Sequence, residues 1–270
     1  MKKPTNEVVG YVSAGGRGTR LNDLFAPDQK TGIAKALLSI GKPQIRLVDH
    51  HINNLRQQGI ERVVIATGDQ YEVFEYINDA YPNDAMVTAT KSVSQLGTGG
   101  DLIEYARSHD RHEDIVAQNV DTILDIDLAA FLGEFNTQSK LGRLATIALT
   151  LNKGVPNENA YTVTEAGRVQ NSKEFRNPVS VDDGIQVSYL GSSTGAVILD
   201  ADFLRQHAWQ LKDGQLSLYR DILKDAWERR GLFAYDNGTR FFRDIGTTAT
   251  WLASQGDEEL QQHLRYNRTV

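Results

Sequence analysis

The sequence predicts an α/β fold, a Rossmann-like and mostly parallel sheet flanked by helices. An apolar run over residues 8–12 breaks abruptly into a glycine-rich turn, SAGGRGTR. Residues 44–58 then space apolar side chains on one helical face, and a second apolar run follows over residues 62–66. A strand, a helix and a strand in this order form a β-α-β unit, whose crossover is right-handed and joins parallel strands.

Later segments extend the same pattern. A second glycine-rich turn, QLGTGG over residues 95–100, opens a predicted helix over residues 101–108. Residues 161–169 predict a β-hairpin with Gly167 in its turn. We expect one domain over residues 1–270, with a nucleotide-binding half over about residues 1–140 and a sugar-phosphate half that carries the hairpin over about residues 141–250. A polar C-terminal helix is predicted over residues 251–270.

The composition excludes several classes of function. The 270 residues are 40% hydrophobic and 24% charged, which is ordinary for a soluble protein. A net charge of −6 argues against a nucleic-acid partner, and the absence of cysteine excludes thiolate metal sites and a cysteine nucleophile. No apolar run is long enough for a membrane span or a secretory signal. We therefore expect a cytoplasmic protein with no membrane partner, while a homo-oligomer stays open.

The first glycine-rich turn has the features of a polyphosphate site. Glycines let phosphate oxygens approach backbone N–H groups, and Arg20 can bind such oxygens bidentately. Lys35 adds a mobile point charge. The P-loop pattern is absent, and the dinucleotide fingerprint would have Leu21 in place of its third glycine. Taken alone, the turn also fits a tight connection without a ligand.

The stretch AGGRGTRL over residues 14–21, followed by a lysine, resembles the signature of the short single-domain sugar-1-phosphate nucleotidyltransferases. Further matches follow in order at LGT over residues 96–98, at Asp121, and at DIGT over residues 244–247. The resemblance covers nearly the whole chain. It implies that a sugar 1-phosphate, or a sugar-like cyclitol phosphate, attacks the α-phosphorus of a nucleoside triphosphate (NTP) in line, assisted by Mg²⁺. The products would be a nucleoside diphosphate sugar and pyrophosphate.

The resemblance also implies roles for single residues. Arg20, Lys35 and Asp121 would be catalytic, and Asp121 and Asp244 would hold Mg²⁺, a hard cation that prefers carboxylate oxygen. The nucleotide would contact Ala14, Gly15, Gly16, Gly18, Thr19, Gln95, Gly97 and Thr98. The sugar phosphate would contact Lys173, Thr194 and Gly195.

The sequence departs from the family pattern at several places. Ala36 stands where the family has proline, Val120 and Thr162 stand where it has glycine, and the order and spacing around Lys173 are altered. These departures predict a substrate other than plain glucose 1-phosphate. They also motivate an alternative function, a catalytically silent regulator that binds a sugar nucleotide.

A second alternative is a metal-dependent glycosyltransferase. Asp125 and Asp127 form a D-x-D pair, which such enzymes use to hold their metal. The same two residues also fit a helix N-cap and a first-turn acid before an apolar helix over residues 128–135.

Overall fold

The computed structural model describes residues 8–16, 34–42, 44–92, 96–109, 113–151, 160–172, 187–206 and 215–266. The strands are β1 (Val8–Ser13), β2 (Ser39–Ile40), β3 (Ile45–Arg46), β4 (Val63–Ala66), β5 (Val87–Thr90), β6 (Asp114–Asn119), β7 (Thr122–Leu124), β8 (Ala145–Thr150), β9 (Ala160–Thr164), β10 (Val169–Ser172), β11 (Val187–Leu199), β12 (Leu232–Asp236) and β13 (Phe242–Asp244).

The α-helices are α1 (Leu47–Gln57), α2 (Tyr71–Ala80), α3 (Gly97–Ser108), α4 (Leu128–Thr137), α5 (Ala201–Gln206), α6 (Lys224–Glu228), α7 (Thr248–Gln255) and α8 (Glu258–Tyr266). Two short 3₁₀ turns, η3 (Lys35–Leu37) and η4 (Gln138–Leu141), and one π-helix, η6 (Leu218–Leu223), complete the described elements.

The central sheet is mostly parallel, and the predicted α/β class is confirmed. β1 pairs in parallel with β4 on one side and with β6 on the other, and β4 pairs in parallel with β5. The long strand β11 pairs antiparallel with β6, β8 and β9. In register, Ser13 lies beside Ala66 and Asn119, so β1, β4 and β6 end together at one edge of the sheet. Ligands of such sheets bind beyond this edge.

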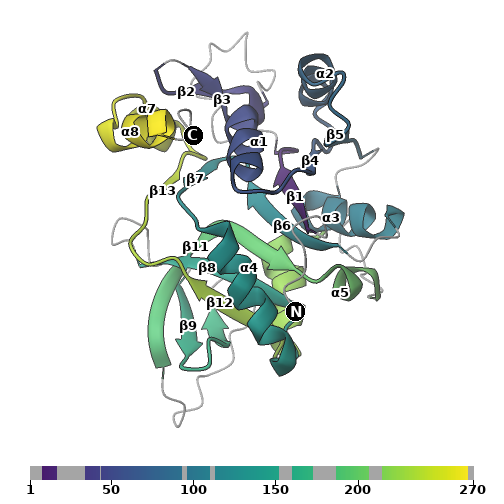
Figure 1. Ribbon diagram of the computed structural model, residues 1–270, viewed down its shortest axis with the longest axis vertical. Helices are drawn as coiled ribbons and strands as arrows, with labels where there is room; N and C mark the ends of the chain where they lie inside the picture. Colours follow the sequence, from purple (N-terminus) through teal and green to yellow (C-terminus); the bar gives the residue numbers. More distant parts are fainter. Residues whose placement is uncertain are drawn as a thin grey trace.

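Helices cover both faces of the sheet (Figure 1). Along β1, Val8 and Val12 belong to one buried cluster while Val9 and Tyr11 belong to the other. Apolar residues of α1, α2 and α4 fill the first cluster, and those of α3, α5 and η6 fill the second. Because β1 is buried on both faces, its sequence is a continuous apolar run without alternation.

Most predicted elements are present, although one helix starts later than predicted. The helix after the first turn begins only at Leu47, because Ile45 and Arg46 pair with β2. Residues 218–228 are helical and start as the π-helix η6 before α6. The hairpin β9–β10 is confirmed, with Gly167 at a φ of 74° between its strands.

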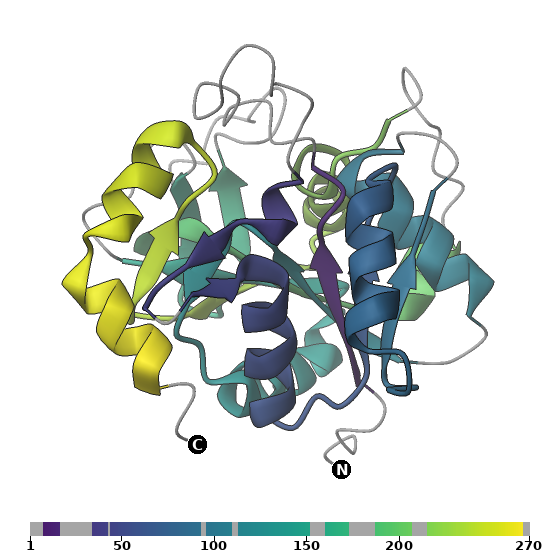
Figure 2. The ribbon, with the colours of Figure 1, turned by 90° about the horizontal axis from the view of Figure 1, so that it is seen from above.

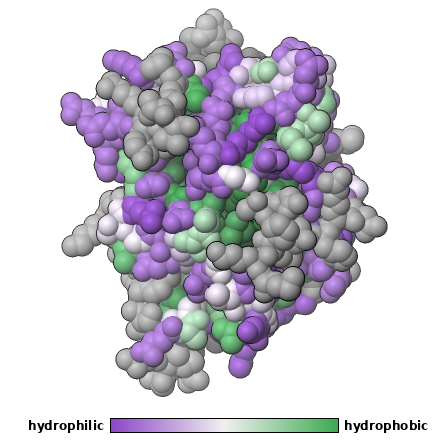
Figure 3. Space-filling model, in the orientation of Figure 1, coloured by the Kyte–Doolittle hydropathy of each residue, from purple (hydrophilic) through white to green (hydrophobic). Residues whose placement is uncertain are grey.

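The prediction of one C-terminal helix was wrong, because the tail forms α7 and α8. Gly256 follows the last residue of α7, and Asp257 then caps the new helix by accepting a hydrogen bond from the Leu260 N–H at 3.0 Å. Figure 2 shows both helices beside β13. Of the described helices, none has the length and apolar character needed to cross a membrane. On the face drawn in Figure 3, hydrophilic residues prevail at the margins and apolar residues show toward the middle.

Candidate active site

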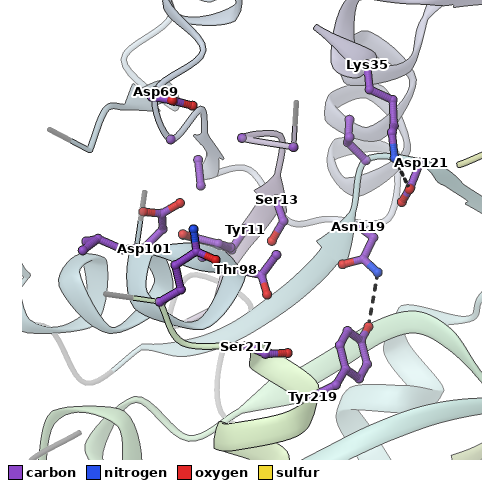
Figure 4. Close-up of a pocket in the computed structure, with 18 of the residues that line it drawn as sticks. Tyr11, Ser13, Lys35, Asp69, Thr98, Asp101, Asn119, Asp121, Ser217 and Tyr219 are labelled. Atoms are coloured by element: carbon purple, nitrogen blue, oxygen red, sulfur yellow. Dashed lines mark hydrogen bonds and ion pairs between the residues drawn. The ribbon is translucent and has the colours of Figure 1, made fainter. Parts of the chain in front are cut away.

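A cleft of about 560 Å³ lies at the carboxyl edge of β1, β4 and β6 (Figure 4). Segments far apart in the sequence form it, among them the turns after these three strands, the start of α3 and the start of η6. Its lining residues are Tyr11, Ser13, Gly15, Gly16, Lys35, Ala66, Gly68, Asp69, Leu96, Gly97, Thr98, Asp101, Asn119, Val120, Asp121, Gln215, Ser217, Tyr219 and Arg220.

The first glycine-rich turn forms one wall of the cleft. A Cβ at Gly15 would lie 3.0 Å from the backbone of Gly68, so the turns after β1 and β4 touch through their glycines. A Cβ at Gly16 would meet no heavy atom of the described residues within 4 Å. Ala14 is buried and donates its N–H to the Ala66 carbonyl oxygen at 2.8 Å. The backbone at Gly16 is therefore the part of the described turn that an anion can approach most freely.

The glycines of the second turn allow close packing. Gly97 has a φ of 74°, and a Cβ there would lie 2.5 Å from the Leu216 carbonyl oxygen. Gly99 donates its N–H to that same oxygen at 2.8 Å. The Thr98 hydroxyl accepts from the Leu218 N–H at 3.1 Å and so joins α3 to η6. These residues build the cleft as well as lining it.

Lys35 and Asp121 meet at one end of the cleft. Lys35 Nζ donates to Asp121 Oδ2 at 2.6 Å, and the two side chains are only 9% and 17% exposed. Lys35 is the first residue of η3, which also contains the buried residue Ala36. Asp121 stands in the turn between β6 and β7. The buried ammonium group and the largely buried carboxylate compensate each other's charge.

Asp244 joins this end through the pairing of two short strands. β13 pairs antiparallel with β7, which sets Asp244 opposite Thr122, and the Ile245 N–H donates to the Asp121 carbonyl oxygen at 2.9 Å. A Cβ at Gly246 would lie 2.6 Å from Asp121 Oδ2 and 2.9 Å from Asp244 Oδ1. Both carboxylates thus converge on one point, and only glycine leaves room for them.

Two converging carboxylates fit a magnesium ion. Mg²⁺ is commonly held by one or two carboxylates, with substrate phosphates and water as its other ligands. Within the described ranges, no group of three or more His, Cys, Asp or Glu residues could hold a metal. A divalent ion at Asp121 and Asp244 would therefore need oxygens from a bound substrate or from water.

The comparison with known proteins decides the family. The family model described as nucleotidyl transferase matches residues 10–258, which is most of the chain. The chain belongs to the nucleotidyl transferase family. No curated protein sequence matches the chain significantly.

Several solved structures share the fold of this chain. A protein named as a putative glucose-1-phosphate thymidylyltransferase from Bacillus anthracis, solved in complex with a sucrose, is 18% identical with a TM-score of 0.70. The match covers 94% of this chain and 95% of that chain. HddC from Yersinia pseudotuberculosis is 17% identical with a TM-score of 0.64, over 92% of this chain and 97% of its own. The same protein complexed with GMP-PN gives a TM-score of 0.63 with the same identity and coverage.

This nucleotidyl transferase brings several of the predicted residues together. Gly15, Gly16, Lys35, Asp121, Gly97 and Thr98 line one cleft, and Asp244 approaches Asp121. Five predicted residues lie outside the described ranges, namely Gly18, Thr19, Arg20, Gln95 and Lys173.

Of the three residues predicted to contact the sugar phosphate, the structure describes Thr194 and Gly195, which differ in their surroundings. The Thr194 hydroxyl is buried and donates to the Ala148 carbonyl oxygen at 3.0 Å, so its side chain faces the sheet. Gly195 has a φ of 79°, and a Cβ there would lie 3.0 Å from Thr122 Oγ1 and 3.2 Å from Asn119 Nδ2. Gly195 stands at the register shift of β11 on β8 and packs behind the turn that carries Asp121.

The D-x-D pair does not face the cleft. Asp127 is the N-cap of α4 and accepts from the Ala130 N–H at 2.9 Å, as the N-cap interpretation predicted. Asp125 is exposed, and neither carboxylate is among the lining residues.

The sequence analysis missed several lining residues. Asn119 donates to the Tyr219 hydroxyl at 3.4 Å, and in Figure 4 it lies between Asp121 and Tyr219. Asp69 follows the end of β4, so the rule that ligands bind at the carboxyl ends of parallel strands was a usable signal for it. Tyr11 lies inside an apolar strand and Asp101 inside a helix, where nothing in the pattern marked them.

Proposed function

We propose that the chain transfers a nucleotidyl group from an NTP to a sugar 1-phosphate or a sugar-like cyclitol phosphate. An oxygen of the sugar phosphate attacks the α-phosphorus, the bond from the α-phosphorus to the bridging oxygen breaks, and pyrophosphate leaves. The family match supports nucleotidyl transfer. The observation that carries the proposal is the convergence of Lys35, Asp121 and Asp244 beside a glycine-rich turn in the cleft.

In this proposal the protein aligns two phosphates and neutralises their charge. The attacking phosphate is already a competent nucleophile, so no covalent enzyme intermediate is needed, and positioning with electrostatic stabilisation provides the catalysis. The backbone at Gly15 and Gly16 faces the triphosphate, and Arg20 also binds its phosphate oxygens. Lys35 turns from Asp121 to the α-phosphate and the incoming phosphate.

Asp121 and Asp244 are the proposed Mg²⁺ ligands. Bound there, the ion would neutralise negative charge on the phosphate oxygens. The Gly246 position leaves the space between the two carboxylates clear of side-chain atoms. Removing either carboxylate should remove the ion and the reaction while the fold persists.

The sugar is proposed to lie toward Asn119 and Tyr219, with Gly195 behind them and Lys173 on its phosphate. The fold alone does not choose a substrate. One structural neighbour is named as a putative glucose-1-phosphate thymidylyltransferase, and another was solved with GMP-PN. The departures at Val120 and Thr162 favour a sugar other than plain glucose 1-phosphate.

The test is pyrophosphate release with Mg²⁺, using ATP, GTP, CTP, UTP and dTTP against a mixed pool of sugar 1-phosphates. Release that needs both substrates is expected, and Asp121→Asn and Asp244→Asn should each abolish it. Asp125→Asn is the matched control, since Asp125 is exposed outside the cleft. Binding of a nucleotide sugar without any release would refute transfer and favour the silent regulator.

A further inference from the structure

The end of the cleft opposite Lys35 is acidic. In Figure 4, Asp69 and Asp101 lie on the far side of Tyr11 and Ser13 from Lys35 and Asp121. Asp69 belongs to the turn after β4, and Asp101 to the first turns of α3. Lys35 lies at the other end of the cleft, and the second basic lining residue, Arg220, belongs to η6. Because carboxylates repel phosphate, a nucleotide whose phosphates lie at Lys35 would place its base here.

Asp101 presents an acceptor to the cleft. The Ser92 hydroxyl donates to its Oδ1, and Ser92 is itself buried. The described residues offer no donor to Oδ2, which lies 3.6 Å from the Cβ position of Gly68. Burial raises the pKa of the Asp101 carboxyl, the Ser92 hydrogen bond lowers it, and the charges of Glu104 and Asp69 raise it further. The carboxylate is thus under-compensated and would gain from N–H donors on a ligand.

Tyr11 is the second observation that points to a ligand. Its ring is fully buried, and its hydroxyl has no hydrogen-bond partner among the described residues. Figure 4 shows this hydroxyl directed toward Asp101. Burial raises the pKa of Tyr11 well above its ordinary value, with the charge of Asp101 adding to the effect, so the hydroxyl stays a donor. A buried hydroxyl without a partner is unfavourable unless something else satisfies it.

The bases differ in what they present to a carboxylate. Guanine carries two adjacent N–H donors, at N1 and N2, beside the O6 acceptor. Adenine and cytosine place an amino group beside an acceptor nitrogen, while uracil and thymine place one N–H between two carbonyl oxygens. A carboxylate has acceptors only, so two adjacent donors suit it best.

We propose that the acidic end of the cleft selects guanine, with Asp101 accepting from N1 and N2 and the Tyr11 hydroxyl donating to O6. This assignment rests on the proposed function, because that function fixes which end of the cleft holds the phosphates. It makes the NTP substrate GTP.

The test is the binding of nucleotides without any sugar phosphate, measured by calorimetry in the presence of Mg²⁺. GTP should bind at least about tenfold more tightly than inosine triphosphate, which lacks the 2-amino group, because one bond to a charged acceptor is lost. UTP and dTTP should bind more weakly still. Equal affinities for GTP and UTP would overturn the proposal without any variant.

Asp101→Asn separates recognition from a structural role. The amide offers one acceptor and one donor, which matches the N1–H and O2 of xanthine, so this variant should bind xanthosine triphosphate more tightly than GTP. A purely structural role would weaken all nucleotides alike. Glu104→Gln is the matched control, because it removes the same charge from an exposed position one turn along α3.

The outcomes for the two proposals are distinguishable. Pyrophosphate release that prefers another NTP would keep the transferase and overturn the guanine assignment. Guanine-selective binding with no pyrophosphate release from any sugar 1-phosphate would keep the guanine assignment and overturn the transferase.

Discussion

Lys35 Nζ lies 2.6 Å from Asp121 Oδ2, so the cation proposed to meet phosphate and the carboxylate proposed to meet Mg²⁺ neutralise each other. Both groups are nearly buried, so removing one of them would leave the charge of the other uncompensated, which is unfavourable. Binding of the proposed metal and nucleotide would separate them. Each partner then exchanges one opposite charge for another.

We expect Lys35→Met to raise the Mg²⁺ affinity of the nucleotide-free protein and to abolish transfer. The substitution frees Asp121 from its competing cation and removes the charge that faces the phosphates. Calorimetric titration with Mg²⁺ and a pyrophosphate assay measure the two effects. Lys140→Met, on η4 outside the cleft, is the control. An unchanged Mg²⁺ affinity would contradict the competition.

Gly246→Ala should reduce transfer by about a hundredfold, the scale expected when catalytic groups are displaced by about 1 Å. A Cβ at this position meets both Asp121 Oδ2 and Asp244 Oδ1 within 3 Å, so the carboxylates must part. Gly256→Ala is the matched control, because a Cβ there meets no described heavy atom within 4 Å. Transfer rates at saturating and limiting Mg²⁺ compare the two variants, and equal rates would refute the convergence of the carboxylates.

Tyr11→Phe should stabilise the ligand-free protein by about 1 kcal/mol or more while weakening GTP binding, because it deletes a buried hydroxyl that lacks a partner. Tyr105→Phe is the contrasting variant. Tyr105 packs its ring against Tyr11, and its hydroxyl accepts from Arg62 Nη2 at 3.5 Å. This second variant should lose stability. Urea unfolding with and without GTP gives both quantities, and a Tyr11→Phe protein that is less stable and binds GTP normally would refute the assignment.

Stability should fall as the pH drops below about 6.5, the ordinary pKa of histidine. Burial lowers the pKa of His51 and His263, so both stay neutral in the folded protein after the unfolded chain has begun to bind protons. The unfolded state then binds more protons, and the free energy of unfolding decreases with falling pH. His51→Gln should flatten this dependence between pH 6.5 and 5 in thermal unfolding. A slope equal to that of the unchanged protein would contradict the role of His51.

Much of the end of the cleft proposed to hold phosphate was predictable from the sequence. An apolar run that ends in glycines favours a buried strand with a tight turn, and Asp121 and Asp244 match the family pattern. What brings these two carboxylates together is the pairing of β7 with β13, which no local pattern encodes. A contact between segments so far apart in the chain depends on tertiary packing.

The end of the cleft proposed to hold the base was not predictable, for a different reason. In the sequence, Asp101 resembles an ordinary surface acid of an amphipathic helix, and Tyr11 resembles a core residue. The sequence does not show that the first turns of α3 pack on Leu216 and Leu218. The π-helix η6 carries Tyr219 into the cleft, and its wider turn has no sequence signal comparable to the period of an α-helix.

The late arrival of β13 has a consequence during protein synthesis. The turns after β1, β4 and β6 belong to the first half of the chain, whereas Asp244 reaches the cleft only when β13 docks on β7. A nascent chain that has not yet emerged from the ribosome as far as β13 would hold one of the two proposed metal ligands. The chain would then become catalytically competent only at the end of folding, so an incompletely synthesised chain could not consume nucleotide.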